Sequence, residues 1–335
     1  MLLRLRAIPG LQISENVPLA ARTRFGIGGP ARLWVDASTE TALAAALRLL
    51  REAGMAHTVV GGGTNLIAGD EGFPGAVVRY SNATIEILPN TLLNTTGAAR
   101  VRGTEGARVR VAAGAVLQDL VDSTIALGLA GLETLTGIPG WVGGAVYGNA
   151  GAYGHSLHER IRGVRYMDGA RDIHTLDNTL DKPACEFGYR DSVFKRHKDW
   201  IVLSVELELD KGVAGELRET AAGIRKIRDE KYPPAICCAG SIFKNLILAE
   251  LPAAARTLVP AQVIREGKVP AAYFLEQAGS KGLAWGGVKV AEYHANLIYN
   301  EGGGTARDLR ELIAELKRRV RERFGIELEE EVQYI

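Results

Sequence analysis

Two glycine-rich runs constrain this chain more than any other feature of its sequence. The first, VVGGGTNL, occupies residues 59–66, and the second, GIPGWVGGAVYGNAG, occupies residues 137–151. Glycine allows a backbone to approach a ligand closely and to adopt positive φ at low cost. Two such runs predict a large phosphate-bearing cofactor that is held mainly by main-chain N–H groups.

The first run does not match the common nucleotide-binding motifs. It lacks the Gly-Lys-Ser/Thr ending of a Walker A loop, and Leu66 stands where a dinucleotide fingerprint has its third glycine. The segment GIGGPA at 26–31 matches the residue pattern of that fingerprint. It contains Pro30 and follows no apolar strand, so we interpret it as a chance match. A strand, a glycine turn and the pair Thr64-Asn65 suit a pyrophosphate. For this run alone, a tight β-turn in a core is an equally good interpretation.

The second run contains few large side chains between Gly137 and Gly154. A plain turn does not need so many small residues in succession. A flat, wide ligand that lies on the backbone, such as an isoalloxazine ring, does need them. The two runs together therefore favour a flavin cofactor.

Composition narrows the class of protein. The chain has 335 residues and a net charge of +1, so it lacks the basic footprint of a nucleic-acid binder. No apolar run reaches the ~18 residues of a membrane span, and residues 1–15 do not resemble a signal peptide. The three cysteines, Cys185, Cys237 and Cys238, form no CxxC motif. We expect a soluble cytoplasmic protein without disulfides, metal site, nucleic-acid partner or membrane partner.

The hydrophobic pattern predicts an α+β order of elements. We expect helices at 39–53, 116–127, 215–232, 271–278 and 306–324, and strands at 57–60, 76–78, 85–87, 108–111, 163–168, 200–209, 297–299 and 326–335. Residues 91–107 look like a polar hairpin excursion. Pro233-Pro234 ends the charged helix before it and marks the best domain boundary.

The motifs, taken in order, resemble those of one flavoenzyme family. TRFGIGGPA, VVGGGTNL and TGIPGWVGGAVYGNAGAYG are similar to the FAD-binding half of UDP-N-acetylenolpyruvoylglucosamine reductases, which have a vanillyl-alcohol-oxidase type of flavin fold. The resemblance continues through FGYRDSVFK, AGSIFKN, GSKGLAWGGVKVAEYHANLIYN and the terminal LEEEV. It covers nearly the whole chain, and the complete set in register is highly specific although each motif alone is weak.

The resemblance implies an α+β fold with a two-lobed FAD-binding part of the vanillyl-alcohol-oxidase (PCMH) type and a C-terminal α/β substrate-binding domain. The expected domains are 1–82, completed by 326–335, then 83–232, and then 233–325. We expect FAD to be non-covalent, because no His or Cys lies at 61–66 and the nearest to the second run are His155 and His158. The cofactor-binding candidates are Gly61, Gly62, Gly63, Thr64, Asn65, Gly137, Ile138, Pro139, Gly140, Gly143, Gly144, Asn149, Ala150 and Gly151.

The resemblance also implies the reaction, which is reduction of an enolpyruvyl ether of UDP-N-acetylglucosamine to UDP-N-acetylmuramate with NADPH, in peptidoglycan precursor synthesis. Negative charge must build on the substrate carboxylate and its neighbouring carbon, and the site must stabilise that charge. Arg190 in the YRDS segment matches the family arginine near the carboxylate, and a guanidinium fork suits a planar carboxylate. Ser241 matches the family proton donor, and Lys244 or another nearby cation would support its proton loss. Glu331 matches the last Glu of the family motif and either donates a hydrogen bond when protonated or orients Arg190.

Each of these residues also has an interpretation without a catalytic role. Arg190 could pair with Asp191, Ser241 could be a turn or cap residue, and Glu331 could belong to a solvated acidic end. Lys231, Asn245 and Lys281 match family positions for the UDP diphosphate, the sugar or the nicotinamide phosphates, and the lysines could equally be surface residues.

The sequence departs from one branch of the family. It lacks the inserted loop whose tyrosine folds over the sugar, because 211–228 runs directly into a helical pattern. The chain therefore resembles the shorter branch, in which Tyr273 and Tyr293 are candidates to close the sugar site. We expect a monomer with a UDP-sugar substrate and NADPH as its small-molecule partners.

Two other functions remain open at this point. An FAD-dependent sugar or lactone oxidase of the same fold would share the glycine runs but would not need Arg190, Ser241 and Glu331 together. A nucleotide-sugar binding protein without catalysis would leave the same three residues free to vary, yet all three are present.

Overall fold

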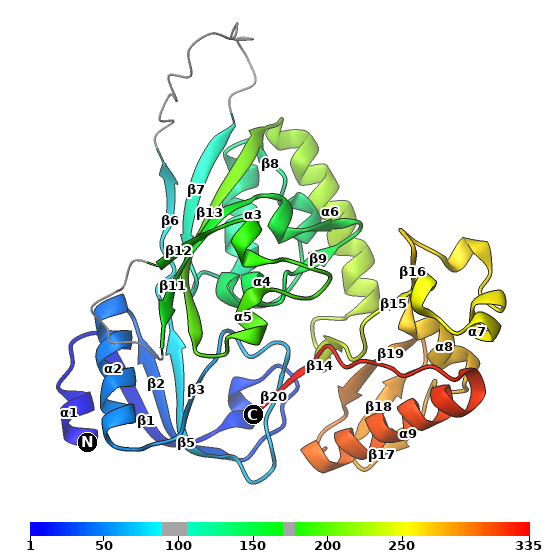
Figure 1. The fold of residues 1–335 in the computed structure, drawn as a ribbon, viewed down its shortest axis with the longest axis horizontal. Helices are drawn as coiled ribbons and strands as arrows, with labels where there is room; N and C mark the ends of the chain where they lie inside the picture. The colour runs from blue at the N-terminus through cyan, green and yellow to red at the C-terminus, as the bar shows by residue number, and fades with distance from the viewer. Residues whose placement is uncertain (89–105, 170–177) are drawn as a thin grey trace, which may run out of the picture. The chain divides into compact units, whose positions relative to one another are not determined.

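The chain forms two compact units. The computed structural model describes residues 1–88, 106–169 and 178–335 (Figure 1). Unit 1 comprises residues 1–14, 34–62 and 76–229, and unit 2 comprises residues 15–33, 63–75 and 230–335. The three domains expected from the sequence stay a prediction. The polar excursion expected at 91–107 lies almost entirely outside the described residues.

A four-stranded sheet leads into the first glycine run. Its strand order is β1 (Leu11–Pro18), β2 (Pro30–Ala37), β5 (Phe73–Tyr80) and β3 (His57–Val59). Strand β3 runs parallel to β5, with His57 opposite Ala76 and Val59 opposite Val78. A short helix, α1 (Leu2–Arg6), precedes the sheet in the chain. Because β3 ends at Val59, the chain enters Gly61–Gly63 directly from a paired strand.

Helix α2 (Glu40–Glu52) follows β2 and shows why the local sequence is helical. The Thr39 hydroxyl accepts a hydrogen bond from the Ala42 N–H at 3.1 Å, which caps the first turn. Leu43, Leu47 and Leu50 recur on one face and are buried. The apolar stripe is therefore the face that packs into the core.

The larger sheet of unit 1 is antiparallel. Its order is β12 (Asn178–Asp181), β11 (Ile161–Asp168), β13 (Trp200–Lys211), β7 (Ala107–Ala112) and β6 (Ile85–Leu88), and β8 (Leu129–Ala130) pairs with the end of β13. Helices α3 (Leu117–Ala126), α4 (Val142–Tyr147), α5 (Val193–Arg196) and α6 (Ala214–Lys231) lie to one side of it (Figure 1). Strands β9 (Gly151–Ala152) and β10 (His155–Ser156) form a small hairpin after α4.

Strand β13 is the centre of this sheet, and its sequence explains its position. Residues 201–205 are all buried, and burial then alternates, with Leu207 and Leu209 buried beside the more exposed Glu206 and Glu208. Glu206 accepts from the guanidinium of Arg108 on the neighbouring β7 at 3.1 Å. The strand thus begins between two covered faces and ends with one face toward solvent.

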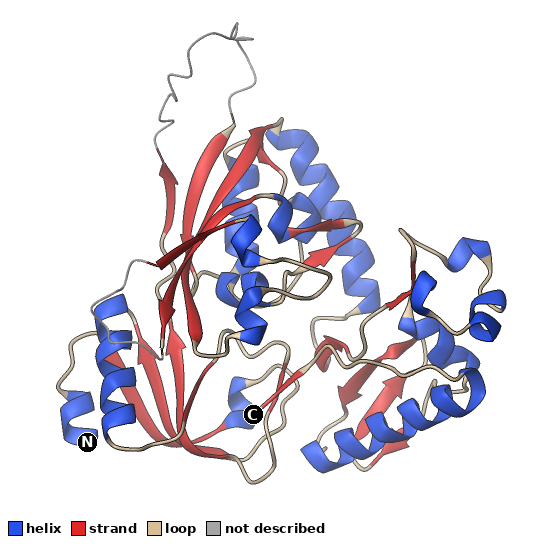
Figure 2. Ribbon diagram, viewed as in Figure 1, coloured by secondary structure: helices blue, strands red, loops and turns tan. Residues whose placement is uncertain are grey.

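Unit 2 has its own antiparallel sheet and core. The order is β14 (Cys237–Ser241), β19 (His294–Asn300), β18 (Val288–Ala291) and β17 (Ala284–Trp285). Figure 2 draws the strands in red and the helices in blue. Helices α8 (Ala271–Gln277) and α9 (Ala306–Phe324) contact this sheet, and α7 (Ala253–Thr257) and the pair β15 (Leu246–Ile247) and β16 (Lys268–Val269) complete the unit. The core gathers Phe25, Ile27, Ile67, Phe243, Phe274, Ile298, Leu312 and Leu316.

Helix α9 is specified at both ends. The Thr305 hydroxyl accepts from the Asp308 N–H at 3.0 Å, and the Asp308 carboxylate accepts from the Thr305 N–H at 2.9 Å. Gly325 ends the helix with φ of +65°. A capping box at the start and a left-handed glycine at the end delimit the helix, as the sequence pattern indicates.

The five expected helices are confirmed to within one residue at each end, because each has a periodic apolar face and a clear end signal. The expected strand over 326–335 is wrong in extent. Only β20 (Gln333–Tyr334) forms there, parallel to β4 (Leu66–Ile67), and Glu330 forms an isolated bridge with Phe243. Short 3-10 turns lie at Leu19–Arg22, Glu133–Leu135, Leu157–Glu159, Pro183–Cys185, Leu248–Glu250 and Ala261–Val263. Over the described part of the chain, no helix combines the length and apolar character required to cross a bilayer.

Candidate active site

The first glycine run contains one position that only glycine fits. Gly63 has φ of +68°, and a Cβ there would come within 2.2 Å of the Arg22 carbonyl oxygen. The Gly63 carbonyl accepts from the Arg24 N–H at 3.0 Å, which fixes the turn. The need for glycine here is therefore partly a matter of backbone packing.

The second run begins with backbone ties to helix α3. The Gly137 N–H donates to Gln118 Oε1 at 2.7 Å, and the Gly140 carbonyl accepts from the Leu117 N–H at 2.9 Å. A Cβ on Gly143 would lie 2.9 Å from the Ala113 Cβ. A short helix that the sequence analysis did not expect, α4, starts one residue before Gly143. Close backbone packing is thus a second reason for small residues in this run.

The two runs come together within unit 1. A Cβ built on Gly61 would lie 3.8 Å from the Gly144 nitrogen, and one on Gly62 would lie 3.1 Å from Trp141 Cδ1. A Cβ on Gly144 would meet no atom within 4 Å. Gly144 therefore faces open space beside the first run, as a backbone that carries a flat ligand must.

Three amide groups at this junction are available to a ligand. Within the described ranges, the N–H groups of Gly61, Gly62 and Gly140 donate no hydrogen bond to a protein acceptor. Backbone N–H groups left over in glycine turns form concavities that bind anions and polar ring edges. The residues present therefore fit FAD, with the glycine runs as its cradle.

A stacked arginine supports this cradle, and sequence analysis missed it. The Arg79 guanidinium carbon lies 4.8 Å from the ring centroids of both Trp34 and Trp141. Arg79 Nε donates to Asp36 Oδ1 at 2.6 Å, and Arg79 is only a fifth exposed. Because Trp141 also contacts Gly62, the stack positions both glycine runs. The signal in the sequence was Trp141 itself, the one bulky residue in the GIPGWVGG segment.

The segment that carries Arg190 is fastened to the second glycine run. Asn149 Nδ2 donates to the Gly188 carbonyl at 2.7 Å, and Arg190 Nη2 donates to the Gly151 carbonyl at 2.7 Å. Ser192 Oγ adds a bond to the Tyr147 carbonyl at 2.7 Å. The structure therefore brings together the predicted cofactor residues Asn149 and Gly151 and the predicted catalytic residue Arg190.

The surroundings of Arg190 favour a functional guanidinium. Its φ is +55°, a left-handed conformation that is uncommon for a residue with a side chain. The Asp191 carboxylate accepts from Arg196 at 2.9 Å, and Lys195 Nζ donates to the Arg190 carbonyl at 2.6 Å. Strained backbone of this kind concentrates at binding and catalytic sites.

Ser241 and Glu331 belong to neighbouring segments of unit 2. Ser241 is the last residue of β14, and its Oγ lies 2.8 Å from the hydroxyl of Tyr232. The Glu331 N–H donates to the carbonyl of Ile242 at 2.7 Å, and its own carbonyl accepts from Asn65 Nδ2 at 3.0 Å. The C-terminal segment is therefore held beside the serine strand and beside the Thr64-Asn65 pair.

The predicted substrate-binding residues take several positions in unit 2. Lys231 ends α6, with its Nζ 5.2 Å from the ring centroid of Tyr232. Lys281 pairs with Glu276 at 2.5 Å, and Asn245 Oδ1 accepts from the first N–H of α8 at 3.4 Å. Lys244, expected to support Ser241, pairs with Glu329 at 2.5 Å.

One residue near Ser241 escaped the sequence analysis. His294 opens β19, and its ring packs edge-on to Tyr232 with centroids 6.0 Å apart. Burial, followed by the positive charges of Lys231 and Lys281, lowers the pKa of His294 to about 3. Its Nε2 is buried and finds no partner among the described residues. A neutral imidazole thus stands beside Tyr232, and the AEYHANLIYN motif was its only signal.

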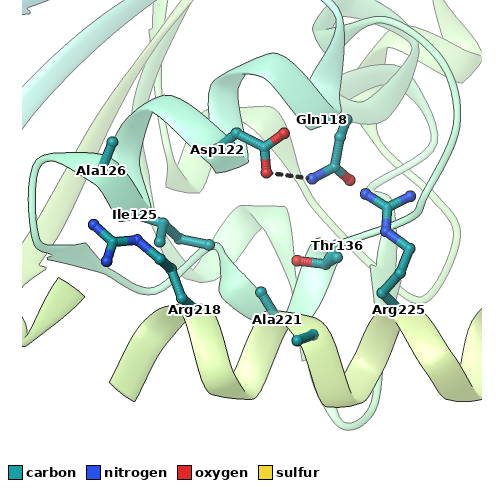
Figure 3. A pocket seen from close by; sticks show the side chains of 9 residues that line it. Gln118, Asp122, Ile125, Ala126, Thr136, Arg218, Ala221 and Arg225 are labelled. Atoms are coloured by element: carbon teal, nitrogen blue, oxygen red, sulfur yellow. Dashed lines mark hydrogen bonds between the residues drawn. The ribbon is translucent and has the colours of Figure 1, made fainter. Parts of the chain in front are cut away.

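A separate hollow lies between α3 and α6. Its volume is about 330 Å³, and Figure 3 shows Gln118 donating to Asp122 at its wall. The lining residues are Gln118, Asp122, Ile125, Ala126, Thr136, Arg218, Ala221, Ala222 and Arg225. None of the predicted site residues lines it, so it is not the candidate active site.

Comparison with known proteins also supports an FAD-binding reductase. A family model described as UDP-N-acetylenolpyruvoylglucosamine reductase, C-terminal domain, matches residues 233–335, and one described as FAD binding domain matches residues 31–177. A UDP-N-acetylenolpyruvoylglucosamine reductase from Solibacter usitatus is 57% identical over 99% of this chain and 100% of its own length. Another, from Rubrobacter xylanophilus, is 35% identical over 98% and 97%.

This chain belongs to the UDP-N-acetylenolpyruvoylglucosamine reductase family. A crystal structure of the reductase from Thermus caldophilus matches the fold with a TM-score of 0.68, at 28% identity over 97% of this chain and 99% of that one. The expected family, the FAD-binding fold with a C-terminal reductase domain, and FAD as cofactor are confirmed. The roles of individual residues stay predictions.

Proposed function

We propose that this protein reduces the enolpyruvyl ether of UDP-N-acetylglucosamine to UDP-N-acetylmuramate, with FAD as its cofactor and NADPH as the electron source. The observation that carries the proposal is the 57% identity to the Solibacter usitatus reductase over essentially the full length of both chains. The reaction supplies a precursor of peptidoglycan and thereby serves cell-wall biogenesis, cell shape and cell division.

The glycine cradle holds FAD without a covalent bond, through the N–H groups of Gly61, Gly62 and Gly140. The bound flavin supplies the hydride that the carbon–carbon double bond of the substrate receives. The protein must then stabilise charge that develops on the substrate carboxylate. Arg190 binds that carboxylate with its guanidinium fork, and the bond from Arg190 to Gly151 fixes the fork in place.

Ser241 completes the reaction as the proton donor to the substrate carbon next to the carboxylate. An alcohol is a weak acid, but the developing carbanion is a strong base, so the transfer is feasible when the two atoms are aligned. Glu331 donates a hydrogen bond to the substrate carboxylate in its protonated form or orients Arg190. The backbone hydrogen bonds of Glu331 with Ile242 and Asn65 fix the position of its Cα atom.

Lys231, Asn245 and Lys281 contact the UDP diphosphate, the sugar or the phosphates of NADPH. Lysine suits phosphate because it acts as a mobile point charge. The sugar site is closed by Tyr273 or Tyr293, of which Tyr293 is about half exposed. The protein works in the cytoplasm as a monomer, with its two small-molecule substrates as partners and no nucleic acid or membrane.

An anaerobic titration tests this function. The purified protein should be yellow, NADPH should bleach it, and the enolpyruvyl sugar nucleotide should restore the colour. Rapid return of colour with oxygen alone would instead indicate an oxidase. A colourless protein that cannot take up FAD would indicate a binding protein and would contradict the proposal.

A further inference from the structure

Ser241 faces a chemical difficulty in its proposed role. An alkyl hydroxyl gives up its proton reluctantly, and the alkoxide that remains is strongly basic. A phenol is a far stronger acid, with an ordinary pKa near 10. A tyrosine hydroxyl that donates to the serine oxygen would replace the serine proton during the transfer.

The structure holds such a tyrosine in contact with Ser241. The Tyr232 hydroxyl oxygen lies 2.8 Å from Ser241 Oγ, the usual length of a hydrogen bond between two hydroxyls. Both side chains are half-buried. If Ser241 directs its single proton toward the substrate, its oxygen is free to accept the Tyr232 proton.

The position of Tyr232 follows from its sequence context. Helix α6 ends at Lys231, and Pro233 restricts the backbone of the residue before it. The Tyr232 side chain packs on the buried cluster Cys238, Ala291 and Leu297. The edge-on ring of His294 contacts it as well. These contacts fix the phenol so that its hydroxyl reaches β14.

We propose that Tyr232 is a positioning residue that aligns Ser241 and returns a proton to it during the reaction. The inference rests on the proposed function. As the substrate carbon takes the proton of Ser241, the Tyr232 O–H bond breaks and its proton moves to Ser241 Oγ. The electron pair stays on the phenol oxygen as phenolate. Water then returns a proton to Tyr232, so one solvent proton enters the product in each turnover.

The charges around Tyr232 suit this step. The ammonium of Lys231 lies 5.2 Å from the Tyr232 ring centroid and favours the transient phenolate. His294 is neutral, so its ring does not compete with Tyr232 as a proton donor to Ser241. The relay therefore consists of two hydroxyls and one neighbouring ammonium.

The test is a proton inventory on the step in which substrate reoxidises the reduced flavin. In wild type, two protons move in the same step, so a plot of the rate constant against the fraction of D2O should be curved. In Tyr232→Phe, this step should slow by about 10- to 100-fold, the cost of one hydrogen bond to the charge that develops on the serine oxygen, and the remaining dependence on the D2O fraction should become linear. Flavin reduction by NADPH should stay close to the wild-type rate. Tyr299→Phe is the matched control, because its hydroxyl donates to Glu301, at 3.2 Å, and not to Ser241.

If Tyr232→Phe shows the wild-type rate of flavin reoxidation and the same curved proton inventory, the relay is overturned. If that variant loses flavin or slows in both half-reactions, the relay is tested instead with 3-fluorotyrosine at position 232. This substitution preserves the shape of the side chain and makes the phenol more acidic. A rate and inventory unaltered by fluorination would then also overturn the relay. Failure of the proposed function looks different, because wild type itself would not be reoxidised by the enolpyruvyl substrate.

Discussion

Arg190 adopts a left-handed backbone conformation that its side chain does not favour. The hydrogen bond from Nη2 to Gly151 and the bond from Lys195 to its carbonyl hold it there. These bonds aim the guanidinium at the second glycine run, in which Asn149 also has positive φ. Local backbone strain is thus retained at a single residue, where the proposed chemistry needs a fixed cation.

Substitution of Arg190 by lysine tests this account. Arg190→Lys keeps the charge but loses the fork, so flavin reoxidation by substrate should slow by about 10- to 100-fold, the cost of one charge-assisted hydrogen bond. Stopped-flow absorbance of the two half-reactions measures the effect. Arg196→Lys, in the same segment and bonded to Asp191, is the control and should change little. Near-normal turnover of Arg190→Lys would refute the carboxylate contact.

The buried His294 predicts how the stability of the protein depends on pH. Its pKa in the folded protein, about 3, lies below the ordinary value of 6.5. Between these values the unfolded chain binds a proton that the folded chain does not, so His294 makes wild type less stable as the pH falls from 6.5 toward 3. The slope approaches about 1.4 kcal/mol per pH unit.

The variant His294→Gln cannot take up this proton. Its melting temperature should therefore fall less steeply with acid than that of wild type, whereas above pH 7 the difference between the two should be constant. Thermal melts from pH 4 to 8 measure the comparison. Parallel curves over the whole range would show that His294 is not buried in its neutral form.

At the scale of elements, the glycine turns set the geometry. Gly63 and Gly54 both have positive φ, +68° and +61°, but they differ in their surroundings. A Cβ on Gly63 would meet the Arg22 carbonyl at 2.2 Å, whereas one on Gly54 would meet nothing within 4 Å. The two glycines form a matched pair that separates backbone strain from steric contact.

We expect Gly54→Ala to cost about 1–2 kcal/mol, the strain of a left-handed alanine. Gly63→Ala should cost more and should weaken FAD retention, because the turn must move away from Arg22. Melting temperature and the ratio of flavin to protein absorbance measure both effects. Equal losses in the two variants would mean that contact with Arg22 is unimportant.

At the scale of the whole molecule, cofactor and fold depend on one another. Residues of the two glycine runs belong to segments that are far apart in the sequence, and the cradle exists only in the folded chain. A ligand that binds only the folded state stabilises it by mass action.

Addition of FAD to flavin-free protein should therefore raise the melting temperature, by an amount equivalent to about 2.7 kcal/mol at 100 times the dissociation constant. Denaturation should release the flavin into solution, because the proposed attachment is non-covalent. Riboflavin at a matched concentration is the control, since it lacks the diphosphate and adenylate. Flavin that stays with the precipitated chain would contradict non-covalent binding.

The sequence alone was enough to predict five of the helices, the family and the cofactor. Helix α9 was predictable because its apolar spacing, capping box and terminal glycine are all local signals. The glycine runs were recognisable because backbone approach to a ligand requires glycine wherever it occurs. The extent of the C-terminal strand was not predictable, because the pairing of β20 with β4 and the bridge of Glu330 to Phe243 depend on partners far away in the chain.

Which side chains meet depends on the folded chain and not on local sequence. Trp141 stacks on Arg79, Arg190 reaches Gly151, and Tyr232 contacts Ser241 through folding rather than through any local pattern. The His294 ring loses its charge for the same reason, since burial and two distant lysines act on it together. Short-range signals specify elements because hydrogen bonds and apolar periodicity repeat along the chain. The chemistry of the site depends on distances of a few ångströms between segments, and only the packed chain fixes those.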